Sequence, residues 1–245
     1  FCSHMNVLRL SIAVLILFCL ATLAAGQTLE EKLSLRVEAF DSESKSIPVR
    51  LVEVAQQFNI PMGIEWSDDL QAKAPSPIHI RNTTLGNLLR QILSQQPGYE
   101  FRLDDGVIHI FASRLLDDPR NFLNIRLREF SLQKANMGAA TFELWGAIIS
   151  HLHPRGGYGG GWGGYSRYKD FDVKKITFSC RDLTVRQALS KIVAVEGNAL
   201  WVVRIRQRQM MEGEPFYIQI PGPEEGEPAR SFDWQFIALD VDRAG

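Results

Sequence analysis

Apolar and polar residues alternate along the chain in patterns typical of strands and helices. Residues 35–39 place apolar side chains at every second position, which predicts a strand. Residues 47–58 repeat apolar positions at spacings of three and four, and Pro48 is tolerated in the first turn of the helix that this spacing predicts. Alternation returns at residues 62–66 and 78–80 and predicts two further strands.

A second helix and a hairpin complete this first unit. Thr84 is a suitable N-cap, and Pro97-Gly98 is a suitable helix end. The apolar face of the helix consists of Leu85, Leu88, Leu89, Ile92 and Leu93. Residues 99–103 and 107–111 flank an Asp-Gly pair, which is a hairpin signal because both positions tolerate positive φ. The predicted order is therefore β-α-β-β-α-β-β.

The same hydrophobic placement recurs one hundred residues later. Ile78, Ile80 and Thr84 correspond to Phe178, Cys180 and Thr184. The apolar helix face reappears as Val185, Ala188, Leu189, Ile192 and Val193, and Gly197 closes the helix as Gly98 does. What repeats is the positions of the apolar side chains, which a duplicated fold retains, and no set of catalytic residues repeats with them.

We therefore predict an α+β protein made of two β-α-β-β-α-β-β modules, each with helices packed on small sheets. The modules are residues 30–116 and 120–208, and the turn Asp117-Asp118-Pro119 separates them. In the second module a helix is predicted from Asn136 to about His151, and strand, helix and strand resume at Ile176, Val185 and Leu200. Residues 209–245 form an extension with an acidic Pro/Gly linker. Within it, residues 216–220 are a candidate strand, and residues 232–239 are apolar with no clear partner.

The first module resembles the short N-terminal domain shared by secretins and TonB-dependent receptors. The matching segments are residues 47–58 (IPVRLVEVAQQF), 78–93 (IHIRNTTLGNLLRQIL) and 98–110 (GYEFRLDDGVIHI). The resemblance covers roughly residues 33–112, and a weaker one covers 122–206. It implies a periplasmic docking module without catalysis, which contacts secretion components in secretins and a membrane regulator in signalling receptors. The duplication and the glycine-rich insertion depart from the family pattern.

The N-terminal segment has the features of a secretory signal peptide. Met5–Arg9 is weakly positive, Leu10–Leu20 is almost wholly apolar, and small residues precede Gln27. The apolar run of about 16 residues is shorter than the roughly 20 that a membrane span needs. We therefore expect residues 1–26 to be a leader and the protein to be periplasmic or secreted, with an uncleaved anchor as the alternative.

Composition narrows the choice of partners. The formal net charge is −1, so the chain lacks the basic excess of nucleic-acid binders, and we expect no nucleic-acid partner. Cys2 and Cys19 lie in the leader, which leaves only Cys180 in the mature chain. No intrachain disulfide is then possible, and Cys180 is expected to be a small buried apolar residue.

The most unusual local feature is the glycine-aromatic insertion at residues 155–168. Ordering it would cost on the order of 15–25 kcal/mol in backbone entropy, so we expect a mobile loop or one that orders against a protein, a glycan or a membrane headgroup region. No Gly-Lys-Ser/Thr phosphate-binding motif is present. The candidate partner-binding residues are Arg155, Tyr158, Trp162, Tyr165, Arg167 and Tyr168.

The remaining candidate chemistry is better explained by structure. His151 and His153 lack the further ligands of a closed zinc site, so we expect no metal and no cofactor. By alternation, His79 and His109 are predicted to face solvent. The adjacent aspartate pairs at 68–69, 104–105 and 117–118 suit turns, and the sequence has neither Gly-x-Ser-x-Gly nor His-Glu-x-x-His. We therefore expect no enzyme activity.

Arginine at every second position marks residues 204–208 as a strand with one basic face. Such charges suit an edge strand that resists unwanted pairing, or else a surface that docks an acidic partner. Together these observations predict a non-catalytic, protein-binding module of the cell envelope, associated with a secretion or outer-membrane transport system. A signalling module that contacts a membrane regulator, and a secreted enzyme of unrecognised type, are the alternatives.

Overall fold

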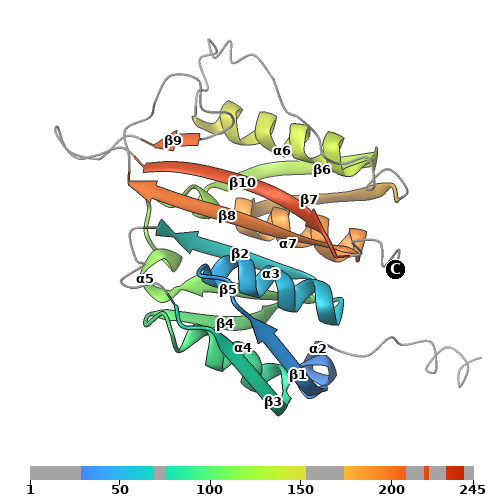
Figure 1. Ribbon diagram of the computed structural model, residues 1–245. Coiled ribbons are helices and arrows are strands. Elements are labelled where there is room, and N and C mark those ends of the chain that lie inside the picture. Colours follow the sequence, from blue (N-terminus) through green and yellow to red (C-terminus); the bar gives the residue numbers. More distant parts are fainter. Residues whose placement is uncertain (1–28, 69–74, 153–173, 208–217, 221–229, 240–245) are drawn as a thin grey trace, which may run out of the picture.

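The computed structural model describes residues 29–68, 75–152, 174–207, 218–220 and 230–239 (Figure 1). The predicted leader, the glycine-aromatic insertion, Arg208 and the acidic linker lie outside these residues. Helices and strands alternate as predicted, so the α+β class is confirmed. The first half comprises α2 (Leu29–Leu33), β1 (Arg36–Ser42), α3 (Ile47–Phe58), β2 (Met62–Ser67), β3 (Ile78–Thr84), α4 (Leu85–Leu93), β4 (Tyr99–Asp104), β5 (Val107–Ala112) and α5 (Ser113–Leu116).

The second half repeats much of this order. After the short 3₁₀ helix η2 (Phe122–Asn124) it comprises β6 (Arg126–Ala135), α6 (Met137–Leu152), β7 (Ile176–Thr184), α7 (Val185–Glu196), β8 (Ala199–Gln207), β9 (Ile218–Ile220) and β10 (Arg230–Ala238). The predicted helix after Asn136 is confirmed as α6, and the Asn136 side chain caps it by accepting a hydrogen bond from the Ala139 amide at 2.8 Å. Of the candidate strand at residues 216–220, the described residues Ile218–Ile220 form β9.

Strands from both halves join in one central sheet. Its order is β4-β5-β2-β8-β10-β9, and β2 pairs in parallel with β5 on one side and with β8 on the other. All six residues of β2 are buried, because neighbouring strands flank it and helices cover both faces of the sheet. The two halves therefore share a single sheet at the β2–β8 pairing.

Helices from the two halves cover opposite faces of this sheet. Figure 1 shows α3 in front of it and α7 behind it, and both helices contact β2 and β8. On the α7 side, the indole of Trp201 in β8 donates a hydrogen bond to Ser190 of α7. Two further antiparallel pairs, β1–β3 in the first half and β6–β7 in the second, form separate two-stranded sheets. One continuous hydrophobic core results.

The internal repeat is visible in individual backbone groups. The Leu85 amide donates to the Leu35 carbonyl at 3.0 Å, and the Val185 amide donates to the Ile125 carbonyl at the same distance. Asn82 in β3 and Asp182 in β7 have the same unusual left-handed backbone, with φ of 49° and 54°. Each of the two helices that follow, α4 and α7, begins at a threonine side chain that accepts a backbone hydrogen bond.

The turn of the first hairpin forms as its sequence predicts. Asp105 and Gly106 have φ values of 48° and 80°, and both central residues of a type I′ turn require such positive values. The hairpin strands β4 and β5 pair in the register that places Asp104 opposite Val107. The Asp104-Asp105 pair is therefore turn chemistry, as expected.

Two expectations about exposure were wrong, those for His109 and Cys180. His79 is exposed as predicted, but His109 is only 1% exposed because β5 is an inner strand with both faces covered. Alternation assigns a solvent face only where a sheet has one. Cys180 is partly exposed rather than buried.

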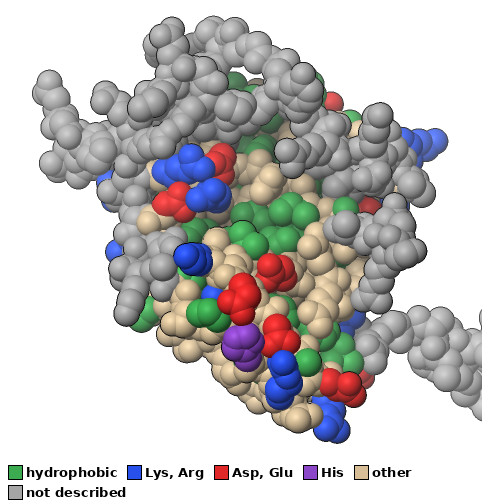
Figure 2. Space-filling view, viewed as in Figure 1, with side chains coloured by type: hydrophobic (Ala, Val, Ile, Leu, Met, Phe, Trp, Pro, Cys, Tyr) green, Lys and Arg blue, Asp and Glu red, His purple; other side chains and the backbone are tan. Residues whose placement is uncertain are grey.

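The expectations for the last strands also change. Residues 232–239 do have a partner, since β10 pairs along its full length with β8. This makes β8 an inner strand, so its arginines do not guard an edge. Arg204 and Arg206 instead reach carboxylates of the same chain: Asp68 and, from Arg206, Asp233. Figure 2 shows such oppositely charged side chains side by side on this face of the molecule.

Candidate functional site

Two features outside the ordinary core could carry function, a buried charged cluster and an open strand edge. The cluster lies where the halves meet: Glu65 on β2, His109 on β5, Arg186 on α7, and Asn121 and Asn124 on the connection between the halves. Arg186 Nη2 lies 3.0 Å and Nε 3.3 Å from Glu65 Oε2.

The asparagines of the connection complete the cluster. Arg186 Nη1 donates to Asn124 Oδ1 at 2.6 Å, and Asn121 Nδ2 donates to the other carboxylate oxygen of Glu65. Asn121 also donates to the Leu115 carbonyl and accepts from the Leu123 amide. The short connection between the halves is thereby fixed against both of them by hydrogen bonds.

Burial controls the charge states in the cluster. It raises the pKa of Glu65, and the Arg186 guanidinium and the Asn121 amide act in the opposite direction. Burial first, and then the positive charges of Arg186 and Arg102, hold the pKa of His109 well below its usual 6.5. The 3.8 Å approach of His109 Nε2 to Glu65 is therefore the contact of a neutral imidazole rather than an ion pair.

The cluster holds the two halves together and is closed to a substrate. Glu65 and Asn121 are fully buried, and Arg186 is 5% exposed. Within the described part of the chain, neither ring nitrogen of His109 has a hydrogen-bond partner. A group that must remain neutral and unpartnered makes the fold sensitive to acid.

We expect His109 to make stability fall in mild acid. The unfolded imidazole takes up a proton near pH 6.5 while the folded one does not, so stability present at neutral pH is lost as the pH falls below about 6.5. Replacing His109 with leucine should remove this pH dependence. Between pH 6 and 5, the free energy of unfolding of the variant should therefore rise relative to that of the wild type by about 1.4 kcal/mol per pH unit. Urea unfolding at each pH measures the difference, and a constant difference would contradict the expectation.

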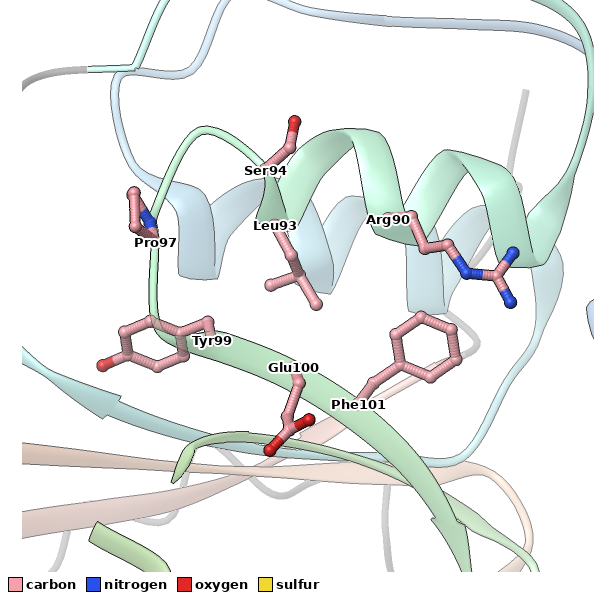
Figure 3. Close-up of a pocket in the computed structure, with 7 residues that line it drawn as sticks. All are labelled: Arg90, Leu93, Ser94, Pro97, Tyr99, Glu100 and Phe101. Carbon is pink, nitrogen blue, oxygen red and sulfur yellow. The ribbon is translucent and has the colours of Figure 1, made fainter. Parts of the chain in front are cut away.

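The open edge is that of β4, the first strand of the central sheet. Beside it is a hollow of about 400 Å³ between β4 and α4, lined by Arg90, Leu93, Ser94, Pro97, Tyr99, Glu100 and Phe101. Figure 3 shows Leu93 pointing from the helix into the hollow and Arg90 extending over the ring of Phe101. Glu100 points away from the helix in the same view.

At the open edge beside this hollow, alternate residues of β4 direct their backbone hydrogen-bonding groups away from β5. The Ser113 amide donates to the Gly98 carbonyl at 3.1 Å. This bond shows which residues of β4 direct their backbone groups toward β5 and which direct them away. In an antiparallel pair the bonded positions alternate, so Glu100 and Arg102 direct their backbone groups to β5 while Phe101 and Leu103 direct theirs outward. Among the described residues no strand pairs with β4 on that side.

Side-chain contacts hold Tyr99 and Arg90, which form two walls of the hollow. Tyr99 stacks on Trp66 with ring centroids 4.3 Å apart, and its hydroxyl accepts a hydrogen bond from the Ser67 amide at 2.8 Å. Burial raises the pKa of the Tyr99 hydroxyl above its ordinary value, so the hydroxyl is protonated at neutral pH. Arg90 Nη1 donates to Asn87 Oδ1 at 2.9 Å, which holds the guanidinium over Phe101.

The residues predicted from the sequence to bind a partner are not placed by the structure. The glycine-aromatic candidates, from Arg155 to Tyr168, lie outside the described residues, as does His153. His151 lies in the last turn of α6. No group of three or more potential metal ligands occurs in the described ranges, and no described helix is long and apolar enough to span a membrane.

The sequence did not reveal the buried cluster, and it did not show that β4 is the strand with the open edge. Glu65 lies between Ile64 and Trp66 in an apolar strand, and Arg186 follows the cap of an amphipathic helix. A charge inside a buried run was a usable signal, because buried charges need a partner. No sequence signal identified Arg90, because an exposed arginine on a helix is unremarkable until the neighbouring strand proves to be an edge.

Comparison with known proteins leaves the family unassigned. No protein-family model, no curated protein and no solved structure matches the chain. The resemblance to the short N-terminal domain of secretins and TonB-dependent receptors therefore stays a prediction.

Proposed function

We propose that the protein is a non-catalytic docking module of the cell envelope that binds an extended segment of a partner protein along β4. The observation that carries the proposal is the outward-directed backbone of Phe101 and Leu103 beside the α4–β4 hollow. An edge with free amides and carbonyls accepts a partner strand, and side-chain pockets beside it supply specificity. The leader-like first 26 residues support an envelope location.

The two kinds of partner proposed are a component of a secretion or outer-membrane transport system and, as the alternative, a membrane regulator. Both belong to the same class of activity, the capture of a protein segment without chemistry. The buried cluster supports this choice over catalysis, because its carboxylate and imidazole lie where no substrate can reach them.

A proline at Leu103 tests the docking edge. The Leu103 amide points away from β5, so proline there removes an outward donor without breaking the β4–β5 ladder. We expect Leu103→Pro to weaken partner binding at least about tenfold, because an added strand loses a backbone bond and meets the ring. Leu103→Ala is the matched control, since it shortens the side chain but keeps the amide, and it should retain most of the affinity.

Peptides selected from a random display library against the full chain are the probe for this measurement. If Leu103→Pro and Leu103→Ala bind the selected peptides equally well, β4 is not the docking edge. Capture from envelope extract with the wild type and the proline variant then separates the partner classes. If the wild type captures a secretion component and Leu103→Pro does not, the first class is supported. If the protein captured by the wild type alone is a membrane regulator, the second class is supported.

A further inference from the structure

The hollow beside β4 has one positively charged end and one apolar end. Arg90 lies at the end nearest Phe101, with its guanidinium carbon 5.8 Å from the centre of that ring. Leu93 and Pro97 line the other part, near Tyr99, where α4 ends and the chain turns into β4. Figure 3 shows this arrangement, with Arg90 and Pro97 at opposite ends.

The guanidinium of Arg90 has donors available for an anion. Among the described residues no carboxylate lies within 4.0 Å of its guanidinium, whereas Arg81 and Arg186 each have one. Its Nη1 is held by Asn87, and the Phe101 ring lies beneath it, so the Nε and Nη2 donors remain in a fixed plane. A planar guanidinium with two adjacent free donors matches a carboxylate, which accepts both hydrogen bonds.

The strand geometry sets the spacing of the groups that a partner would need. Phe101 lies beneath Arg90 of α4, and Arg102 lies over Phe111 on the opposite face of the sheet. Side chains at Tyr99, Phe101 and Leu103 therefore share the face toward α4. The residues of an added strand that lie opposite these positions share that face as well, two positions apart, with one near Arg90 and the next near Leu93.

On the basis of the proposed docking function, we propose that the partner segment is an acidic β-strand, antiparallel to β4, with an acidic residue two positions before a large apolar one. The acidic side chain lies opposite Phe101 and binds Arg90, and the apolar one lies opposite Tyr99 and fills the hollow at Leu93. Antiparallel addition is the commoner form of strand pairing, and it requires the order acidic-x-apolar.

The test compares three synthetic seven-residue peptides, centred on glutamate-x-leucine, on lysine-x-leucine and on the reversed leucine-x-glutamate. We expect the first to bind the full chain about tenfold more tightly than the second, as two charge-assisted hydrogen bonds allow. Arg90→Glu should reverse this preference and favour the lysine peptide. Arg126→Glu is the control, because it makes the same charge change on the exposed face of β6.

Fluorescence anisotropy gives the affinities, and amide chemical shifts of Phe101 and Leu103 show whether the peptide lies on β4. Binding at β4 without a charge preference, or with a preference for the reversed order, would overturn the ligand chemistry but leave strand docking intact. If none of the peptides selected from the display library shifts the amide signals of Phe101 and Leu103, the docking function itself would be overturned. An equal effect of Arg90→Glu and Arg126→Glu would show that only net charge matters, and would also overturn the assignment.

Discussion

Replacing Arg186 with methionine is expected to lower the free energy of unfolding by about 3 to 5 kcal/mol, as breaking a buried ion pair does. The variant leaves the Glu65 carboxylate fully buried without its cation, and it also removes the 2.6 Å hydrogen bond to Asn124. Chemical denaturation at neutral pH measures the loss. A loss below about 1 kcal/mol would mean that the cluster does not hold the halves together.

The pH dependence of this variant gives a second, independent readout. Without Arg186 the pKa of Glu65 rises further, so the folded state favours the protonated acid. A carboxyl whose pKa is raised by folding stabilises the folded state most below its unfolded pKa of about 4.3, and this stabilisation is lost as the pH rises. The loss of unfolding free energy in Arg186→Met should therefore be smaller at pH 5 than at pH 8.

Two further variants serve as controls for Arg186. The double replacement Glu65→Leu with Arg186→Met should be more stable than Arg186→Met alone, because it removes the orphaned charge. Arg81→Met breaks an exposed pair with Asp41 of similar length, 2.8 Å, and should change stability little.

Introducing valine at Gly63 is the second change with a large expected effect. A Cβ at this position in β2 would lie 2.7 Å from Nε1 of Trp201 and closer still to the six-membered part of its indole, and the backbone there belongs to the β2–β8 pairing. Trp201 is fully buried, so the ring has nowhere to move. We expect a loss of about 3 kcal/mol or more, although valine ordinarily favours strands.

Thermal unfolding measures the Gly63 effect, and two comparisons assign it to the indole. Gly63→Val combined with Trp201→Leu should lose less than the sum of the single changes, by more than about 1 kcal/mol of coupling, because the smaller side chain makes room. Gly146→Ala in α6 adds a Cβ with nothing within 4 Å and should stabilise by roughly 0.5–1 kcal/mol. If the losses from Gly63→Val and Trp201→Leu simply add, the clash with the Trp201 indole is not the cause of the Gly63→Val loss.

Local elements of this protein are readable from its sequence. The helix caps at Thr84 and Thr184 and the turn at Asp105-Gly106 lie where the pattern predicts them. These features depend on residues within four positions of one another, so the local chemistry determines them. The recurrence of apolar positions after one hundred residues also predicts the matching pairs of strand and helix that the structure contains.

Pairings between distant segments were not readable. The β2–β8 contact joins Ile64 to Val202, and no rule of alternation reveals which of several apolar strands will meet. The expectations for His109 and for the arginines of β8 were wrong because the order of strands in the sheet was unknown. The first assumed that β5 has a face open to solvent, and the second assumed that β8 is an edge strand. The docking edge at β4 depends on the same knowledge, since a strand is an edge only once the whole sheet order is known.

The position of β2 in the centre of the sheet has a consequence for how the chain folds. β2 ends at Ser67, but β8, its neighbour on one side, begins only at Ala199. At a synthesis rate of about 5–20 residues per second, the first segment waits on the order of ten seconds for the second to be made. Throughout that interval the amides and carbonyls of β2 that will pair with β8, next to Met62, Ile64 and Trp66, lack a partner strand and are accessible to other chains. The newly made chain therefore depends on a late-arriving segment to complete its interior, and anything that delays that segment prolongs its most aggregation-prone state.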